Sequence, residues 1–406
     1  MTKALIIGGG VAGPTTAIAL QKAGIEPVVY EAYDRGADGI GQNLVLAVNG
    51  YSALLALGMD HLTDGFDIPR YRFHLGNGKQ LAQVPNGAPL PDGTVARAIT
   101  RSDLYTTLRD EAINRGIEVN FGKQLVDAKI TDKGVTAFFA DGTTAEGDLL
   151  VGADGLHSVT RKTIDPAELK FRYGGLWTTG GYATGVSAPS HTGTEFMYLG
   201  KRAFFCHIPD HEGRIWWYAS VTRQKEPTPE ELASLTPEAW RESLYELFAK
   251  DESSAVEIVK ATEEIWPPRP IYDIPHLPKW HNGRMIVIGD ACHATSPSAG
   301  QGVSMAIEDS VELARCLRDI PDIAEAFERF EEIRRKRVER VVEFGRQCGR
   351  ALQVNGPLMR IGRDIFARVA YSERGSREGQ EEMRWLYEHR IDWDTPIGRV
   401  GAGVGA

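Results

Sequence analysis

Residues 3–13, KALIIGGGVAG, decide the fold of the N-terminal part of the chain. The apolar run KALIIG at their start predicts a buried parallel strand, and the residues that follow, 14–22, predict a helix. Between strand and helix, Gly8, Gly10 and Gly13 stand in G-x-G-x-x-G spacing. The first glycine permits a tight turn, the second lets the backbone approach a pyrophosphate, and the third lets the helix pack closely on the strand.

The neighbouring sequence continues this pattern. The glycine loop, with Val11 and Ala12 inside it, opens a helix whose N-terminus offers N–H groups and a positive dipole end to phosphates. A second predicted strand, residues 27–30, ends at Glu31, whose carboxylate can accept hydrogen bonds from ribose hydroxyls. Arg35 is a candidate for the cofactor's edge or a 2′-phosphate, with a plain surface arginine as the alternative. The order of these parts predicts a Rossmann-type dinucleotide-binding unit.

Composition narrows the class of protein. The chain has 406 residues and a net charge of −9, so it is long enough for two or three domains, and its acidic balance argues against nucleic acid or anionic membranes as partners. No stretch approaches the roughly 18 apolar residues of a membrane-spanning helix. The four cysteines, at positions 206, 292, 316 and 348, lie far apart. That spacing favours neither a disulfide framework nor a metal site, and we expect a cytoplasmic protein.

Two later segments also place an acid directly after an apolar strand. Residues 149–154 (LLVGAD) end in an aspartate that precedes a glycine, and residues 285–288 run into a Gly-Asp pair and then a G-Q-G turn before a predicted helix. Ligands of open α/β sheets bind at the carboxyl ends of the strands. The candidate cofactor contacts in these segments are Asp154, Gly289, Asp290, Pro297, Gly300, Gly302 and Val303.

Through these three ordered motifs the sequence resembles the FAD-dependent aromatic hydroxylases, single-component flavoprotein monooxygenases of the para-hydroxybenzoate hydroxylase type. The motifs are the glycine fingerprint, Asp154-Gly155 and Gly289-Asp290. The resemblance implies an α/β fold in which a Rossmann-type FAD-binding domain is interleaved with an antiparallel β-sheet substrate domain and followed by C-terminal helices. It also implies that Arg101 lies near the FAD pyrophosphate, that Leu125 borders the adenine, and that Asp290 bonds the ribityl chain.

The resemblance implies the reaction as well. NADH or NADPH, bound only transiently, reduces FAD, and O₂ then forms a C4a-hydroperoxyflavin whose distal oxygen attacks an aromatic or polyketide-like small molecule. Because the cofactor carries this chemistry, the protein needs only to position the substrate, exclude water and steer a phenolic proton. A flavin-dependent reductase, a halogenase and a flavoprotein scaffold without turnover remain alternatives. A monomer and a homodimer are equally compatible with the sequence.

The motifs divide the chain into regions. We expect the FAD-binding domain in residues 1–70, 99–165 and 281–320, and the substrate domain in residues 71–98 and 166–280. Residues 321–394 should form a helical region, and residues 395–406 a flexible tail. In the helical region, the basic run RRKR at 334–337 is flanked by glutamates at helical spacing and predicts a solvated face. Arg337 falls on the apolar stripe of that helix, which predicts a buried partner or a dimer contact.

Aromatic residues gather in the expected substrate domain. Residues 171–218 contain eleven of them in short strand-like segments, which predicts an antiparallel meander with one face over the flavin and the substrate. The candidate pocket residues are Phe196, Tyr198, Phe205 and Trp216, although ordinary core packing is the alternative for each. No catalytic residue is certain from the sequence. His207 and Tyr218 are the titratable candidates for handling a substrate proton.

Overall fold

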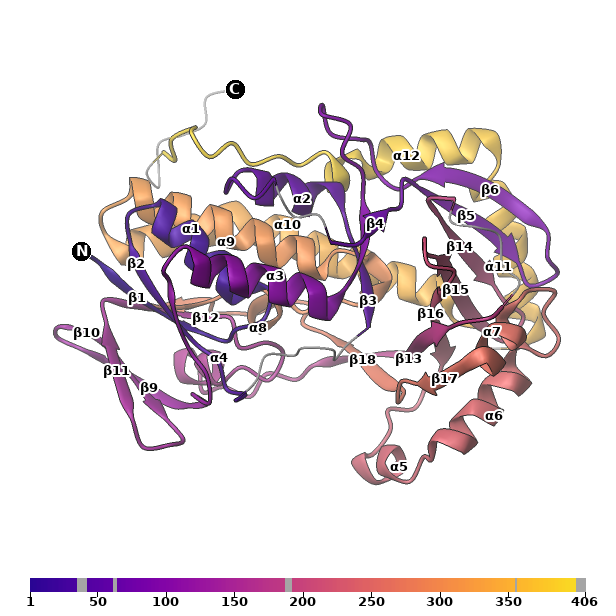
Figure 1. Ribbon diagram of the computed structural model, residues 1–406, viewed down its shortest axis with the longest axis horizontal. Coiled ribbons are helices and arrows are strands. Elements are labelled where there is room, and N and C mark those ends of the chain that lie inside the picture. Colours follow the sequence, from indigo (N-terminus) through magenta and orange to yellow (C-terminus); the bar gives the residue numbers. More distant parts are fainter. Residues whose placement is uncertain (35–41, 61–63, 187–191, 355, 399–406) are drawn as a thin grey trace.

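The first sheet of the fold is mostly parallel and carries all three motifs. The computed structural model (Figure 1) describes residues 1–34, 42–60, 64–186, 192–354 and 356–398. Sheet A has the strand order β19-β20-β12-β1-β2-β8 and pairs in parallel everywhere except at its edge strand β19. Its strands are β1 (Lys3–Ile7), β2 (Glu26–Tyr30), β8 (Glu118–Asn120), β12 (Leu149–Gly152), β19 (His281–Asn282) and β20 (Met285–Val287).

This strand order explains why distant motifs meet. Strand β12 lies between β1 and β20, and parallel strands end at the same edge of a sheet. The glycine loop, the Asp154 turn and the Gly289 turn therefore lie side by side. Helix α1 (Ala12–Lys22) follows the glycine loop and packs on α9 (Gly302–Asp319), where the hydroxyls of Thr16 and Ser310 are hydrogen-bonded at 2.8 Å.

Two small antiparallel sheets branch from this domain. Sheet D joins β9 (Leu125–Thr131), β10 (Gly134–Phe139) and β11 (Thr144–Gly147), and it lies at the end of the molecule remote from the aromatic strands (Figure 1). Sheet B joins β3 (Asn43–Leu46), β7 (Arg97–Thr100) and β4 (Phe66–Asp67). Helices α2 (Val48–Leu55) and α3 (Arg101–Asn114) follow β3 and β7 directly, so sheet B sets where each of them begins.

The second large sheet, sheet C, holds the aromatic segments. Its order is β17-β13-β16-β15-β14-β5-β6, with β18 paired to β13. The expected antiparallel substrate sheet is present, with one parallel pair between β5 and β14. Its strands are β5 (Arg70–Leu75), β6 (Gln80–Pro85), β13 (Arg172–Ala183), β14 (Thr194–Leu199), β15 (Ala203–Pro209), β16 (Ile215–Thr222), β17 (Thr262–Ile265) and β18 (Arg269–Asp273).

The two faces of sheet C pack against different parts of the chain. Its outer face, which carries Phe205 and Trp217, is covered by α6 (Pro237–Phe248) and α7 (Ala255–Ala261). Its inner face, which carries Cys206, Trp216 and Tyr218, packs against sheet B and the C-terminal helices. The pairing of Cys206 with Tyr218 and of Phe205 with Ala219 places alternate residues of each strand on opposite faces.

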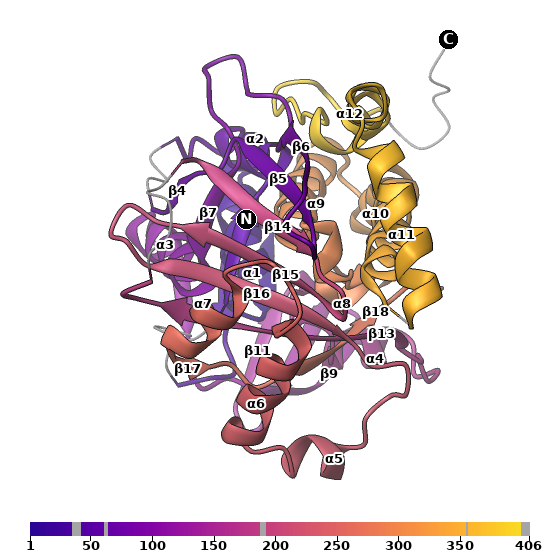
Figure 2. The same ribbon diagram turned by 90° about the vertical axis from the view of Figure 1, so that its right-hand side faces the viewer.

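Three helices complete the chain: α10 (Ile323–Leu352), α11 (Pro357–Ala370) and α12 (Glu373–Tyr387). Helix α10 packs on α9 and also reaches β13, so it connects the two large sheets. Helix α11 crosses the inner face of sheet C near Leu199 and lies at the outer edge of the molecule (Figure 2). Among the described residues, none of the helices is both long enough and apolar enough to cross a bilayer.

Candidate cofactor and substrate site

The glycine loop after β1 has one position that is open to a ligand. Gly8 has φ of +105°, and a Cβ there would lie 2.4 Å from the carbonyl oxygen of Ala153. A Cβ at Gly13 would lie 1.9 Å from the carbonyl oxygen of Gly8. A Cβ at Gly10, in contrast, would meet no heavy atom within 4 Å. Two of the glycines are therefore required by the protein's own packing, whereas the space beside Gly10 suits an approaching phosphate.

Glu31 is held against this loop. Its Oε2 accepts a 2.5 Å hydrogen bond from the N–H of Gly9, and its Oε1 accepts a 3.0 Å hydrogen bond from the N–H of Tyr33. Its carbonyl oxygen also accepts a hydrogen bond from Lys123, two residues before the buried Leu125 at the start of β9. The expected ribose-side acid and the expected adenine-side residue thus border the same end of sheet A.

Three further residues were expected to contact the cofactor on this side, and their surroundings differ from those of Glu31. Arg101 is the first residue of α3, where its side chain is exposed and its N–H donates to the carbonyl oxygen of Gln42 at 3.0 Å. Asp154 accepts hydrogen bonds from the N–H groups of Val159 at 2.9 Å and Thr160 at 3.0 Å, so it caps the short helix α4 (Val159–Ile164). Arg35 lies outside the described residues.

The Gly-Asp turn after β20 is held in place by a buried aspartate. Gly289 has φ of +56°, and its N–H donates to Oδ2 of Asp309 at 2.9 Å. The same oxygen lies 2.6 Å from Nε2 of His293. Asp290, the next residue after Gly289, is the first residue of α8 (Asp290–His293). Its side chain is exposed, so its carboxylate is available to a ligand.

The turn before α9 presents unsatisfied polar atoms. The 3₁₀ helix η1 (Pro297–Ala299) ends at Gly300, where φ is +62°, and α9 begins two residues later with Gly302 and Val303. Nδ2 of Asn49 donates to Oε1 of Gln301 at 3.0 Å. Within the described part of the chain, several buried atoms around this turn have no hydrogen-bond partner, namely Asn49 Oδ1, Gln301 Nε2, Ser304 Oγ and Thr295 Oγ1. Buried polar atoms are normally paired, so this set indicates a polar ligand.

These features fit FAD. The space beside Gly10 is free for a diphosphate to approach, and Glu31 stands at the end of β2 beside the same loop, the position of the ribose-binding acid in the dinucleotide fingerprint. The N-terminus of α9 offers free N–H groups and a positive dipole end, which suit the electron-rich edge of a flavin ring. The unpaired amide and hydroxyl groups of Asn49, Gln301 and Ser304 supply further donors and acceptors at that end.

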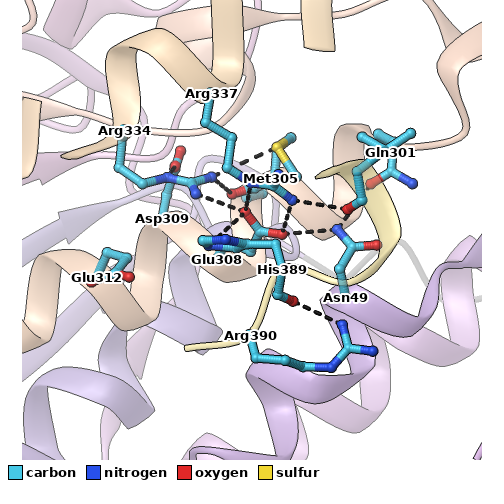
Figure 3. Close-up of polar contacts among 12 residues, drawn as sticks. Asn49, Gln301, Met305, Glu308, Asp309, Glu312, Arg334, Arg337, His389 and Arg390 are labelled. Atoms are coloured by element: carbon cyan, nitrogen blue, oxygen red, sulfur yellow. Dashed lines mark hydrogen bonds and ion pairs between the residues drawn. The ribbon is translucent and has the colours of Figure 1, made fainter. Parts of the chain in front are cut away.

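A buried ionic network supports the flavin side of the site (Figure 3). Arg334 on α10 donates to Oε2 of Glu308 and to Oδ1 of Asp309, both at 2.7 Å. Arg337 donates to both carboxylate oxygens of Glu308 at 2.8 Å. Glu308 in turn accepts a 2.8 Å hydrogen bond from Nδ2 of Asn49. The network therefore anchors Asn49 through Glu308 and the Gly289 turn through Asp309.

Two predictions from the sequence concern residues of this network, and the structure contradicts one and confirms the other. The basic run 334–337 was expected on a solvated face, and this is wrong for Arg334, which is only 1% exposed and faces two carboxylates on α9. The expected buried partner of Arg337 exists and is Glu308. Burial alone would raise the pKa of Glu308 and Asp309, but the surrounding cations outweigh it and lower each pKa to about 2.

The register of sheet C separates the nominated aromatic residues. Phe196 pairs with His207 and Tyr198 with Phe205, so these residues share the outer face, away from the FAD-binding domain. Of the four nominated pocket residues, only Trp216 lies on the inner face, where it contacts Phe66 of sheet B.

The two nominated titratable residues are also separated. His207 is 3% exposed on the outer face and stacks on Phe196 at 4.9 Å. Burial, with a smaller contribution from His74, lowers its pKa to about 3. Tyr218 lies on the inner face, where burial raises its pKa well above the ordinary range. Only Tyr218 is therefore on the side of the sheet that is turned toward the cofactor domain.

Next to Tyr218 is a buried acid that sequence reasoning missed. Glu195 on β14 is 2% exposed, and its Oε1 accepts a 2.8 Å hydrogen bond from Sγ of Cys206. Burial raises its pKa to about 7, while hydrogen bonds with Cys206 and Tyr218 act in the opposite direction. The only sequence signal was an acid alternating with apolar residues in a predicted strand, and alternation alone does not say which face is buried.

This acidic cluster of Glu195, Cys206 and Tyr218 is continuous with the flavin side. Tyr71 lies beside Glu195 and is hydrogen-bonded to Tyr387 at the end of α12. A Cβ at Gly87 would lie 3.0 Å from Val48 and 3.2 Å from the Tyr387 ring, so that ring borders the start of α2. Asn49, the next residue, contacts Gln301.

A cleft of about 470 Å³ opens where the two parts of the chain meet. Residues of sheet B, the start of α3 and the inner face line it, among them Phe66, Ser102, Tyr182 and Trp216. Nε1 of Trp216 donates to Oδ2 of Asp210 at 2.9 Å, which fixes the indole in the wall of the cleft. Ser102 follows Arg101, so the cleft adjoins an expected cofactor contact.

A Rossmann-type sheet that fits FAD, set against a second, largely antiparallel sheet, is the architecture of a single-component FAD-dependent monooxygenase. The chain belongs to the FAD binding domain family, which it matches over residues 1–345. The protein is a flavoprotein monooxygenase that uses FAD and takes its electrons from NAD(P)H.

Individual relatives agree with this assignment. The chain is 31% identical to the FAD-dependent urate hydroxylase of Klebsiella pneumoniae subsp. pneumoniae, over 84% of this chain and 88% of the relative. It is also 31% identical to a 3-amino-4-hydroxybenzoate 2-monooxygenase of Streptomyces platensis, over 94% of both chains. A Klebsiella pneumoniae enzyme solved with FAD and uric acid superposes with a TM-score of 0.82 at 25% identity, covering 95% of this chain and 97% of that one.

Gly10 and Gly13 give a matched test of the cofactor site. We expect Gly10→Val to leave the melting temperature of the FAD-free protein unchanged, because a Cβ there meets no heavy atom within 4 Å. The same change should weaken FAD binding more than about 100-fold, because the side chain occupies the space of the pyrophosphate. Fluorescence titration of FAD into the stripped protein measures this affinity.

The control is Gly13→Ala, whose Cβ would overlap the Gly8 carbonyl oxygen. It should lower the melting temperature of the FAD-free protein as well as the FAD affinity. Unchanged FAD binding by Gly10→Val would contradict the placement of the cofactor.

Proposed function

We propose that this monooxygenase hydroxylates an aromatic compound that carries an acidic O–H or N–H group and that binds against the inner face of sheet C. The observation that carries the proposal is Glu195, a buried carboxyl group with a pKa of about 7 beside Tyr218. A base whose pKa is close to the working pH is the most effective acceptor of a substrate proton. Its burial on the face toward the cofactor domain supports a role in the reaction.

In the proposed mechanism, the acidic cluster of Glu195, Cys206 and Tyr218 removes a proton from the substrate. Cys206 and Tyr218 hold the Glu195 carboxylate by hydrogen bonds. Glu195 then accepts the proton of the substrate's O–H or N–H group, either directly or through the Tyr218 hydroxyl. Loss of that proton makes the ring more electron-rich, which favours attack on an electrophilic oxygen. When bound, FAD supplies the activation of O₂.

Aromatic side chains of the inner face give this space an apolar wall. Trp216 packs edge-on against Phe66 of sheet B at 4.9 Å, and Tyr182 packs against Trp216 at 5.6 Å. A substrate bound against these rings displaces water from the cleft that they line. A water-poor site strengthens the electrostatic interactions within it and protects reactive intermediates from hydrolysis.

Several finer assignments belong to the same proposal. The substrate is an aromatic or polyketide-like small molecule, the electron donor is NADH or NADPH, and the protein works in the cytoplasm. All four cysteines lie in the described part of the chain as free thiols, which supports a reducing compartment. The residues proposed to contact FAD are Gly8, Gly10, Val11, Ala12, Gly13, Glu31, Arg35, Arg101, Leu125, Asp154, Gly289, Asp290, Pro297, Gly300, Gly302 and Val303.

Isotope labelling tests the proposed reaction. We expect FAD-loaded enzyme to oxidise NAD(P)H faster when a suitable phenol or N-heterocyclic aromatic compound is added, and the product to carry one oxygen atom from labelled O₂. Mass spectrometry of products formed in labelled O₂ and in labelled water distinguishes the source of that atom. A reduced product without label would instead indicate a reductase. No acceleration across a broad aromatic panel would indicate a scaffold without turnover.

A further inference from the structure

Helix α11 has its apolar side turned away from the protein. Its large apolar residues are all substantially exposed, from 49% for Ile361 to 84% for Leu358. The side of the helix that faces the body presents Ala367, its one buried residue, and Arg363, which donates to the carbonyl oxygens of Leu199 and Gly200 at 2.9 Å. Surface helices normally bury their apolar stripe against the core. The exposed residues are Leu358, Met359, Ile361, Ile365, Phe366 and Val369.

The size of this surface matches a protein interface. The six side chains expose on the order of 700 Å², compared with the roughly 800 Å² that each partner contributes to a standard interface. The largest apolar patch of a typical monomer is about 300–600 Å². Figure 2 shows α11 at the outer edge of the molecule, where a partner can reach it. The patch is therefore large enough to be the main contact of a stable complex.

The positions of the patch, although not its residue types, are symmetric about the middle of the helix. Its central positions are 358, 361, 362, 365, 366 and 369, a set that maps onto itself when the helix is reversed about the bond between residues 363 and 364. In that arrangement Leu358 faces Val369, Ile361 faces Phe366, and Gly362 faces Ile365. A two-fold axis requires such self-complementarity, because each residue meets its counterpart on an identical surface.

A glycine in the middle of the stripe adds an independent observation. Gly362 is exposed within α11, and a Cβ there would meet no heavy atom within 4 Å. Glycine inside a helix is destabilising relative to alanine, and nothing in the described part of the chain requires it at this position. A small residue at a helix crossing lets two backbones approach closely. In the reversed pairing, Gly362 provides the space that the partner's Ile365 fills.

We propose that α11 forms the contact of a two-fold symmetric homodimer, in which it packs antiparallel against α11 of a second copy of this chain. An antiparallel pair also places opposite ends of the two helix dipoles side by side. The inference does not depend on the reaction proposed above, because it concerns a different surface. It selects the homodimer from the two oligomeric states that the sequence left open.

The charges beside the patch nearly cancel. On α11, Arg360, Arg363 and Arg368 are accompanied by Asp364. On α12, which packs beside α11, three of the four glutamates form ion pairs with Arg374, Arg377 and Arg384. These charges neither hold the patch on an anionic membrane nor oppose a second copy of the chain. The identical patch of a second copy carries no charged side chain among its six central positions and so meets no repulsion there.

Sedimentation velocity of the FAD-loaded full chain tests the dimer. We expect wild-type protein in the micromolar range to sediment at twice its mass of 44.6 kDa. Ile365→Glu and Phe366→Glu should weaken dimerisation more than about 30-fold, because each introduces two buried charges at the centre of the interface. Flavin absorbance and melting temperature at low protein concentration should stay unchanged, because these side chains are exposed in the monomer. Val126→Glu is the matched control, since Val126 is 52% exposed on β9 at the other end of the molecule.

Three outcomes would overturn the proposal. One is a wild-type monomer at all concentrations, and another is an Ile365→Glu variant that remains dimeric. The third is a monomer in solution that cosediments with phosphatidylserine vesicles through the same residues.

Chemical cross-linking tests the orientation. In the antiparallel pair the two Ile365 residues are offset by three positions, about 4.5 Å along the helices, whereas the two Leu358 residues are offset by eleven positions, about 16 Å. A short bismaleimide should therefore join Ile365→Cys protomers and should not join Leu358→Cys protomers. Wild-type protein treated in the same way controls for Cys348, the one cysteine that is not fully buried. Efficient cross-linking of both variants would overturn the antiparallel arrangement.

Discussion

We expect Glu195→Gln to lower the rate of substrate hydroxylation by about 10²- to 10⁴-fold, the usual contribution of a positioned general base. The wild-type rate at limiting substrate should rise with pH through about 7, as the Glu195 carboxyl group loses its proton. Glutamine has nearly the same shape but cannot accept a proton, so this rise should disappear. Steady-state rates of product formation between acidic and mildly alkaline pH measure both effects.

The stability of the same variant separates catalysis from folding. The pKa of Glu195 in the folded protein, about 7, lies above its ordinary value of 4.5, so the folded state holds the proton more tightly. The stability that this provides is fully present below about pH 4.5 and is lost as the pH rises through 7. Glu195→Gln should therefore be at least as stable as wild type above pH 7 although it is much less active.

Glu264→Gln serves as the control, because Glu264 is an exposed acid on β17 of the same sheet. It should change neither the rate nor its dependence on pH. A Glu195→Gln enzyme that kept the wild-type rise in rate near pH 7 would show that another group accepts the proton.

We expect Arg334→Met to reduce the free energy of unfolding by about 3–5 kcal/mol, the usual cost of removing one partner of a buried ion pair. The substitution keeps most of the side-chain volume but leaves Glu308 and Asp309 as buried carboxylates with less compensating charge. Because these carboxylates hold Asn49 and the Gly289 turn, FAD should also dissociate more readily. Thermal unfolding and FAD titration measure the two effects.

Arg329→Met is the matched control on the same helix. Arg329 pairs with Glu332 at 2.9 Å, but the Glu332 side chain is 47% exposed. Solvent-exposed pairs of this kind contribute at most about 1 kcal/mol, so Arg329→Met should be close to wild type. An equal loss of stability in the two variants would show that the buried network has no special role.

The pH dependence of stability provides a further check on the network. Because the pKa values of Glu308 and Asp309 in the folded protein, about 2, lie below their ordinary values of 4.5 and 3.8, the folded state favours their charged forms. This stability is present above about pH 4.5 and is lost as the pH falls toward 2. Arg334→Met should lose much of this acid dependence along with its stability.

The cofactor side of the protein was largely predictable from local sequence. The glycine loop, Glu31 and the Gly-Asp turn each depend on a few consecutive residues between one strand and one helix, where steric rules act directly. Helices α10 (Ile323–Leu352) and α11 (Pro357–Ala370) both lie in the region 321–394 that was expected to be helical. The sequence did not indicate that α11 faces outward, because its apolar stripe has the ordinary spacing of a core-facing helix.

The substrate side was decided by register and distant contacts. All four nominated pocket residues were expected near the substrate, but strand pairing puts Phe196, Tyr198 and Phe205 on the face opposite to Trp216 and Tyr218. Nor did it indicate that Glu195 lies beside Cys206, since that depends on the pairing of two strands. A shift of one residue in strand pairing exchanges the two faces of a sheet, and no local pattern specifies it.

The sequence by itself thus determined the class of protein and its cofactor, through motifs whose geometry is set within about 30 residues. Only the tertiary structure decided which acid faces the substrate side, that Arg334 is buried, and that α11 exposes its apolar stripe. The physical reason is distance along the chain. Glu308 is hydrogen-bonded to Asn49, which lies 259 positions away in the sequence, and to Arg334, which lies 26 positions away. Whether a charged side chain is solvated or buried depends on the partner that such a contact supplies.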